Sequence, residues 1–171
     1  VKAIMVWDFS ADMNQPLGRM VGNSLEVMEC VECLKGEGPA DLREVVLELA
    51  AEMLLLRSQG EHPSDHGAAR SKAESALQTG AAWEKFRQRV MAQGGDVSTV
   101  DDTKRLDVAP ETELLRAPRN GHIGPIDCRE IGNAAVVLGA GRACVSDTID
   151  PGVGLEMLVR LGYPVAAGDP L

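Results

Sequence analysis

The chain has 171 residues, of which 44% are hydrophobic and 25% charged, a composition typical of a folded globular protein and unlike that of a disordered one. This length allows a buried core in one domain, or in one domain and a small second. The net charge of −9, without a basic patch, argues against nucleic-acid binding. No apolar run approaches the roughly 20 residues of a membrane-spanning helix, and the start lacks a signal-peptide pattern. We therefore expect a cytoplasmic protein with neither nucleic acid nor membrane as a partner.

The N-terminal residues predict a strand, a loop and a helix. Residues 2–7 form a short apolar run bounded by Asp8, which fits a buried strand of a parallel sheet. Residues 12–18 contain Pro and Gly and should form a loop. A helix is expected over residues 24–35, because apolar side chains recur at three- and four-residue steps, at Leu25, Met28, Val31 and Leu34.

The ends of this helix and the start of the next are marked by their residue types. Asn23 can cap the first helix while Glu26 reaches back as in a capping box, and Gly36 can take the left-handed conformation that ends it. Pro39 then opens a second helix that should end near Gly60. Its wide apolar face is made by Leu42, Val45, Val46, Leu49, Met53 and Leu56.

Two more helices are expected before the character of the chain changes. Ser64 and Asp65 start one that reaches about Gln78. Another follows Gly80 and stops at the Gly-Gly pair 94–95; its apolar side chains are Trp83, Phe86 and Val90.

After this Gly-Gly pair, short runs with Gly, Pro and Val predict a β-rich module. The candidate strands are residues 113–117, 121–127, 145–149, 154–158 and 163–166, and residues 131–137 fit a short helix or a strand. The expected domains are therefore residues 1–95, part of an α/β domain that is mostly helical here, a linker at 96–109, and a β-rich domain at 110–171.

Cysteine and histidine pairs raise the question of a metal or redox site. Cys30 and Cys33 have C-x-x-C spacing, but they lie in a predicted helix and no second pair accompanies them, since Cys128 and Cys144 are far along the chain. Ordinary buried or half-buried thiols are the favoured reading. His62 and His66 could share a helix face and bind a metal, but a polar loop leading into a helix cap is favoured, because no H-E-x-x-H pattern follows. His122 has no identifiable nucleophile nearby.

Two further features could bind ions. Residues 138–142, Leu-Gly-Ala-Gly-Arg, could hold an anion with their amides and the Arg142 guanidinium, although a structural turn is favoured. Glu29 lies on the helix that follows the 12–18 loop, where its carboxylate and loop carbonyls could converge on a hard cation. Spacing alone favours a solvated helix face for such a glutamate.

The order of several motifs resembles the thymidine phosphorylase and pyrimidine-nucleoside phosphorylase family. In the N-terminal half these are Asp-Met-Asn-Gln-Pro-Leu-Gly at 12–18, Val-Gly-Asn-Ser-Leu-Glu-Val at 21–27, Leu-Lys-Gly-Glu-Gly-Pro-Ala-Asp-Leu-Arg at 34–43, and Phe86 with Ala-Gln-Gly-Gly-Asp at 92–96. In the C-terminal half they are Ile-Gly at 131–132, Leu-Gly-Ala-Gly-Arg at 138–142, Asp-Thr-Ile-Asp at 147–150 and Val-Gly at 153–154. Only the first dozen residues fit the family poorly.

The resemblance implies phosphorolysis, in which inorganic phosphate as co-substrate attacks C1′ of a pyrimidine nucleoside and no organic cofactor takes part. In the family, a Gly-Ser-rich phosphate loop and an Arg, Ser and Lys set carry the reaction, all N-terminal to the matched part and absent here. We therefore expect a fragment with no catalytic or substrate-binding residue, inactive alone, from a parent that is a homodimer whose dimer contact is mostly missing. Its last domain should be a truncated, barrel-sandwich-like α+β domain.

A potassium site of some bacterial members also maps onto this chain. By position in the motif, the backbone oxygens of Leu17 and Met20 and the carboxylate of Glu29 would be its ligands. Two other functions remain open. A carrier or binding module would present a lysine at a hairpin tip, but no lysine follows Lys104. A different enzyme could use Arg142, Asp147 and Asp150, if they converge in one pocket with the helical half.

Overall fold

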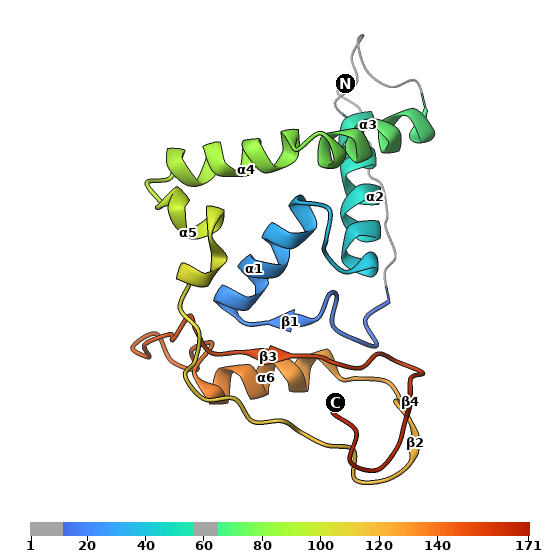
Figure 1. Cartoon of the computed structure of the whole chain (residues 1–171), viewed down its shortest axis with the longest axis vertical. Helices are drawn as coiled ribbons and strands as arrows, with labels where there is room; N and C mark the ends of the chain where they lie inside the picture. Colours follow the sequence, from blue (N-terminus) through green and yellow to red (C-terminus); the bar gives the residue numbers. More distant parts are fainter. Residues whose placement is uncertain (1–11, 57–64) are drawn as a thin grey trace, which may run out of the picture.

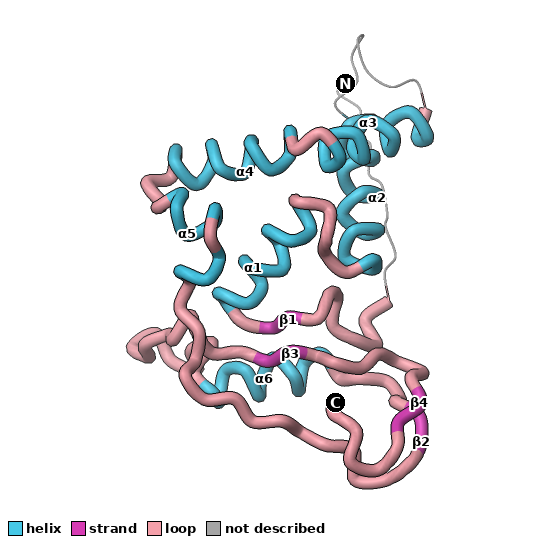
Figure 2. The backbone as a smooth tube through the Cα atoms, in the orientation of Figure 1, coloured by secondary structure: helices cyan, strands magenta, loops and turns pink. Residues whose placement is uncertain are grey.

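Six α-helices and a 3-10 helix hold most of the regular structure within residues 12–56 and 65–171, the parts of the chain that the computed structural model describes (Figures 1 and 2). The helices are α1 (Asn23–Leu34), α2 (Ala40–Leu56), α3 (His66–Gln78), α4 (Ala81–Ala92), α5 (Val97–Asp101), η1 (Thr103–Arg105) and α6 (Cys128–Leu138). The strands are β1 (Met20–Val21), β2 (Gly121–His122), β3 (Leu155–Glu156) and β4 (Pro164–Val165). The predicted strand at 2–7 and His62 lie outside the described residues.

Helix α1 begins and ends close to the predicted residues, but its N-cap differs. Gly22 is the N-cap residue, and Glu26 reaches back to accept a hydrogen bond from the Gly22 amide at 3.0 Å. The Asn23 side chain instead donates to the carbonyl of Ala140 in the C-terminal part of the chain, so the predicted Asn23 cap is wrong. Gly36 has φ of +90° at the C-terminal end, which confirms its predicted left-handed conformation.

Helices α2 and α3 pack side by side around the main hydrophobic core. Leu47 of α2 is buried against Ala73 and Leu77 of α3. Ion pairs edge this contact: the Arg70 guanidinium pairs with Glu44 and Glu48, and Arg43 pairs with Glu74, while His66 lies 2.9 Å from Glu48. Helix α4 follows α3 directly, and its Trp83 ring lies 4.6 Å below the ammonium group of Lys35.

The segment after Gly95 contains helices that the glycine-rich pattern did not predict. Asp96 caps α5 by accepting a hydrogen bond from the Ser98 amide, and Asp102 caps η1 in the same way through the Lys104 amide. These helices are too short to show an apolar period, since α5 buries only Val100 and η1 buries none of its side chains. The hydrogen bonds with Ser98 also lower the pKa of Asp96.

The C-terminal part of the chain has fewer and shorter strands than predicted (Figure 2). Only two residues of each of the 121–127, 154–158 and 163–166 segments form strands, in the antiparallel pairs β1–β3 and β2–β4. In 113–117 only Arg116 forms an isolated bridge, with Pro170. The predicted strand at 145–149 is wrong, because Asp147 accepts hydrogen bonds from the Ala143 and Cys144 amides and folds this segment into a turn.

Of the two alternatives for residues 131–137, helix is the correct one. Asp127 caps α6 by accepting hydrogen bonds from the Arg129 and Glu130 amides, and Gly139 ends it with φ of +110°. The fold class is thus mixed helical with small sheets, as predicted in coarse terms, whereas a barrel-sandwich-like sheet is not seen in residues 12–56 and 65–171. The domain limits at 95, 96–109 and 110 stay a prediction. Among the described helices, none is long and apolar enough to cross a membrane.

The C-terminal part lies along β1 and the start of α1, below the helices in Figure 1. Strand β3 pairs with β1 in the register Met20–Glu156 and Val21–Leu155, and the Ser24 amide donates to the Pro151 carbonyl at 3.0 Å. A Cβ on Gly154 would lie 2.3 Å from the Val21 carbonyl oxygen, so this close approach requires glycine. The loop before β1, residues 12–19, therefore lies where the C-terminal part of the chain meets helices α1 and α2, and we call it the junction loop.

Candidate functional site

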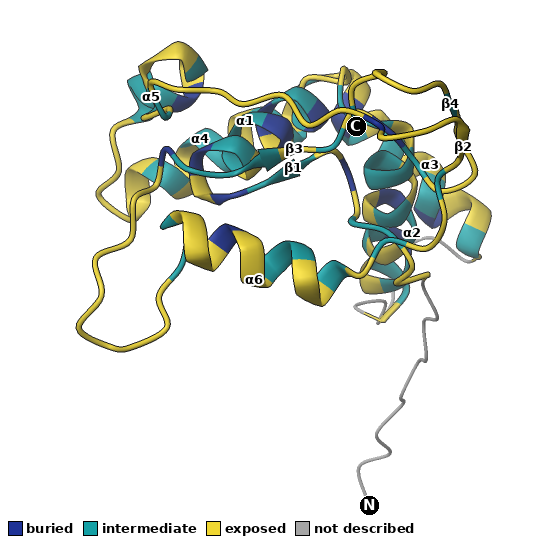
Figure 3. Ribbon diagram, turned by 90° about the horizontal axis from the view of Figure 1, so that it is seen from below, coloured by how far each residue is buried: buried dark blue, intermediate teal, exposed yellow. Residues whose placement is uncertain are grey.

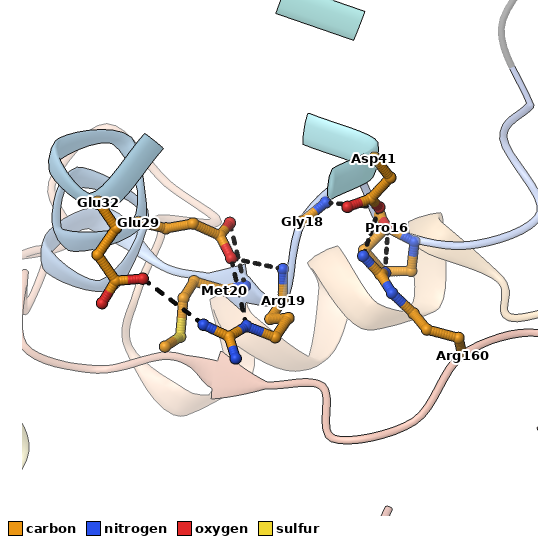
Figure 4. Close-up of polar contacts among 8 residues, drawn as sticks. All are labelled: Pro16, Gly18, Arg19, Met20, Glu29, Glu32, Asp41 and Arg160. Atoms are coloured by element: carbon orange, nitrogen blue, oxygen red, sulfur yellow. Dashed lines mark hydrogen bonds and ion pairs between the residues drawn. The ribbon is translucent and has the colours of Figure 1, made fainter. Parts of the chain in front are cut away.

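Glu29 holds the junction loop from the side of α1 (Figure 4). Its side chain is buried, and its carboxylate accepts hydrogen bonds from the Arg19 amide at 2.7 Å and the Met20 amide at 3.4 Å. The Arg19 guanidinium lies 3.9 Å from the same carboxylate and pairs with Glu32 at 3.5 Å. The predicted solvated face is therefore wrong for Glu29, because the loop covers it.

Gly18 is the residue that lets the loop close over this carboxylate. Its φ is +69°, and a Cβ there would lie 2.1 Å from Oε2 of Glu29. A side chain would be strained by the left-handed backbone and would also displace the carboxylate.

Asp41 and Arg160 hold the same loop from the opposite side (Figure 4). Asp41, in the first turn of α2, accepts a hydrogen bond from the Gly18 amide at 3.2 Å and pairs with Arg160. The second guanidinium nitrogen of Arg160 donates to the Pro16 carbonyl at 2.8 Å. One arginine thus joins the C-terminal part to both the loop and the start of α2. No local sequence pattern marks either member of this pair, because 119 residues separate them along the chain.

The predicted potassium ligands belong to this loop and to the helix that it contacts. The register of β1 and β3 makes Met20–Glu156 a pair that does not exchange backbone hydrogen bonds, because the Met157 amide donates to the Arg19 carbonyl. The Met20 carbonyl therefore points away from β3. The Met20 amide also points away from β3, toward the Glu29 carboxylate. One carboxylate and carbonyls of one short loop suit a hard monovalent cation, so the donor types fit. The amides of Arg19 and Met20 already donate to the Glu29 carboxylate, and potassium binding by Leu17, Met20 and Glu29 stays a prediction.

A pocket of about 420 Å³ opens beside this loop, between α1, α2 and α6. Apolar side chains dominate its lining, and its charged members are the carboxylates of Glu26 and Glu29. No Lys, Arg or His lines it, so the lining offers phosphate no cationic partner. It also contains the thiols of Cys30, Cys33 and Cys128.

The two thiols of the C-x-x-C pair lie in different environments, and the prediction of buried or half-buried thiols is confirmed for Cys33 but wrong for Cys30. Cys33 is buried and Cys30 exposed, and both are free. Partial loss of water around its sulfur raises the pKa of the Cys30 thiol, although the residue as a whole is exposed. Burial, together with Cys30 and Glu29, raises the pKa of the Cys33 thiol, and a raised pKa opposes the thiolate needed for redox or metal chemistry. No group of three potential metal ligands is found in the described ranges. The His66 Nε2 atom lies 2.9 Å from a carboxylate oxygen of Glu48 at the contact between α2 and α3.

Residues 138–142 and the rival site do not assemble into a pocket with the helical half. Asp147 caps the turn at 143–144, and Asp150 accepts a hydrogen bond from the Gly152 amide. Arg142 is exposed, and no hydrogen bond or ion pair joins it to either carboxylate within the described part of the chain. None of the three lines the 420 Å³ pocket, which argues against the second enzyme hypothesis.

A second hollow, of about 440 Å³, lies near β2 and β4 and was not foreseen. Arg119, Asn120 and His122 line it, and all three residues are exposed. The Asn120 side chain already accepts a hydrogen bond from the Ala167 amide. No Asp or Glu side chain lines this hollow.

Comparison with known proteins adds to this geometry. Residues 122–171 match the family model described as the pyrimidine nucleoside phosphorylase C-terminal domain. Over 161 residues, 94% of the chain, the sequence is 43% identical to the pyrimidine-nucleoside phosphorylase of Bacillus subtilis strain 168. It is 39% identical over the same length to that of Staphylococcus aureus strain USA300. The match covers 36% of each relative, so the chain spans about a third of their length.

Proposed function

Because this chain is related to the C-terminal part of the pyrimidine-nucleoside phosphorylases, we propose that it supplies the C-terminal scaffold of an enzyme that cleaves pyrimidine nucleosides with inorganic phosphate. The reaction is pentosyl transfer: phosphate attacks C1′, the glycosidic bond breaks, and the electron pair leaves with the base. Charge develops on the leaving base and must be stabilised by placed donors, while phosphate needs cationic groups. In this proposal those groups belong to the part of the relatives that the chain does not cover.

The character of the 420 Å³ pocket carries this proposal. An anion entering it would face Glu26 and Glu29 with no cationic side chain in the lining. Two carboxylates without a cationic partner in the lining disfavour phosphate binding, so the pocket is unsuited to phosphorolysis. The clamped loop between Glu29 and the Asp41–Arg160 pair instead suits a structural role, because it fixes how the C-terminal part sits on α1 and α2.

The remaining properties follow from the resemblance and stay predictions. Phosphate would be the co-substrate and a pyrimidine nucleoside the substrate of the assembled enzyme, without an organic cofactor. The homodimeric state, the cytoplasmic location and a potassium ion at Leu17, Met20 and Glu29 belong to the same set. If potassium binds there, it would supply a positive charge that the loop carbonyls and the Glu29 carboxylate coordinate together. Glu29 and the Asp41–Arg160 pair position the loop.

The proposal is tested with two proteins: the 171-residue chain alone, and a chimera in which it replaces the matching part of the Bacillus subtilis relative. Release of thymine or uracil from thymidine or uridine, in the presence of phosphate, is followed by absorbance. We expect no turnover by the chain alone and turnover by the chimera. Turnover by the chain alone would refute the assignment of the chemistry to the uncovered part. A folded but inactive chimera would refute the scaffold role.

A further inference from the structure

Helix α2 is apolar on two opposite faces, and within residues 12–56 and 65–171 only one of them is packed against a neighbouring helix. On the face toward α3, Leu47 and Ala51 are 1% and 0% exposed. On the other face the side chains at alternating steps of four and three residues form what we call the α2 stripe: Leu42, Val46, Leu49, Met53 and Leu56. An apolar helix face that stays exposed while the opposite face packs against a neighbour indicates a second packing partner.

The α2 stripe continues the apolar lining of the 420 Å³ pocket. Leu42 and Val46 line that pocket, and the stripe then runs outward through three side chains that are exposed by 39%, 67% and 52%: Leu49, Met53 and Leu56. From its first to its last residue the stripe spans about 21 Å at the rise of an α-helix. This is the length of a helix face or of several strands, and the steps of four and three residues suit packing against a regular element.

Helix α6, on another side of the pocket, also has exposed apolar side chains. Helix α6 closes one side of the pocket with Ile131 and Gly132, but it buries only Ala135 among its side chains. Figure 3 shows α6 mostly in the colour of exposed residues. Its apolar side chains Val136, Val137 and Leu138 are 37%, 87% and 56% exposed. Exposed apolar surface on this scale marks an interaction site in a folded protein.

We propose that the α2 stripe and the adjoining pocket are the docking surface for an apolar element of the part of a pyrimidine-nucleoside phosphorylase that this chain does not cover. The relatives match the chain at 43% and 39% identity but are only 36% covered by it, so about two thirds of their length remains as a source of that element. The inference rests on the proposed function for the identity of the partner. It adds which helix face the partner covers.

The test compares the same substitution with and without the partner. Met53→Glu is made in the 171-residue chain and in the Bacillus subtilis chimera, and the unfolding temperature is measured for each by circular dichroism. Met53 is 67% exposed, so the isolated chain should lose less than about 1 °C. In the chimera, where docking buries the side chain, the loss should exceed about 3 °C. Val145→Glu, at a residue 90% exposed and away from α2, is the matched control and should be neutral in both.

The stability losses of Met53→Glu in the two proteins decide whether the α2 stripe is covered in the longer chain. Equal small losses in both proteins would overturn the proposal, because the stripe would then stay uncovered in the longer chain. A large loss already in the isolated chain would also overturn it, and sedimentation would show whether a second copy covers the stripe. A second chimera on the Staphylococcus aureus relative guards against one background that does not fold; failure of both chimeras to fold would count against a complementary face. If the chimera loses stability as expected but lacks phosphorolysis, docking stands and the proposed function fails.

Discussion

Arg160 should contribute more to stability than any exposed arginine of this chain, because it joins two parts of the fold at one point. Its guanidinium donates to the Pro16 carbonyl at 2.8 Å and pairs with Asp41, which also accepts a hydrogen bond from the Gly18 amide. Arg160→Ala removes both contacts and leaves the Asp41 carboxylate with the Gly18 amide alone. The C-terminal part would then be held to α2 less firmly.

The size of the effect follows from the burial of the pair. The side chains of Arg160 and Asp41 are 22% and 36% exposed. Hydrogen bonds to charged groups contribute about 1.5–3 kcal/mol when buried, and exposed ion pairs about 0.2–1 kcal/mol. A half-buried pair lies between these limits, so Arg160→Ala should lower the free energy of unfolding by about 2 kcal/mol. For a chain of this size the unfolding temperature should fall by about 4–8 °C.

Urea unfolding followed by circular dichroism measures this loss. Arg142→Ala is the matched control, since Arg142 is exposed and has no hydrogen bond or ion pair to the rest of the described chain, and it should change the free energy of unfolding by less than about 0.5 kcal/mol. A double-mutant cycle with Asp41→Asn isolates the coupling between the two side chains. A loss at Arg160 no larger than the control, or a coupling near zero, would refute the reasoning.

Three further predictions concern the loop and the thiols. Gly18→Ala should cost more than Gly36→Ala, by about 1–3 kcal/mol, because both glycines have positive φ but only at Gly18 would the new Cβ meet the Glu29 carboxylate; equal costs by urea unfolding would contradict the contact. Cys33 should react with iodoacetamide more slowly in the folded chain than in urea at pH 8. Because folding raises the pKa of this thiol, its contribution to the free energy of unfolding should be complete below its ordinary pKa of about 9.0 and be lost as the pH rises through the pKa of the folded state. Alkylation at the same rate in both states would exclude this burial. If potassium binds at Glu29, potassium chloride should raise the unfolding temperature more than choline chloride does, and Glu29→Gln should remove the difference; an equal response to both salts would exclude the site.

Local patterns were sufficient where a helix depends on its own residues. The end of α1 at Gly36 follows from the conformational freedom of glycine, and the cap of α3 from the Asp65 side chain, which accepts a hydrogen bond from the Ala68 amide. These interactions span four residues or fewer, so the sequence nearby contains them. The potassium ligands came from the resemblance alone and remain untested.

Patterns failed where a residue's partner is far along the chain. The Asn23 side chain meets Ala140 instead of its own helix end, and the buried state of Glu29 depends on a loop that folds back over it. The segments predicted as strands in the C-terminal part contain β-branched and apolar residues, but their pairing depends on what lies opposite. Because that is a loop or a turn at most positions, only two-residue pairs form.

The sequence by itself determined the order and most of the limits of the first four helices and the similarity to the phosphorylases, because periodicity, capping residues and ordered motifs are all local. Only the tertiary structure decided that Glu29 and the Asp41–Arg160 pair clamp one loop from two sides, and that a second apolar face of α2 is exposed in the part of the chain that the structure describes. Hydrogen bonds and burial between residues of different elements depend on how those elements pack, whether the residues are ten positions apart, as Arg19 and Glu29 are, or 119, as Asp41 and Arg160 are. Helical periodicity shows that α2 is apolar, but not which of its faces is covered.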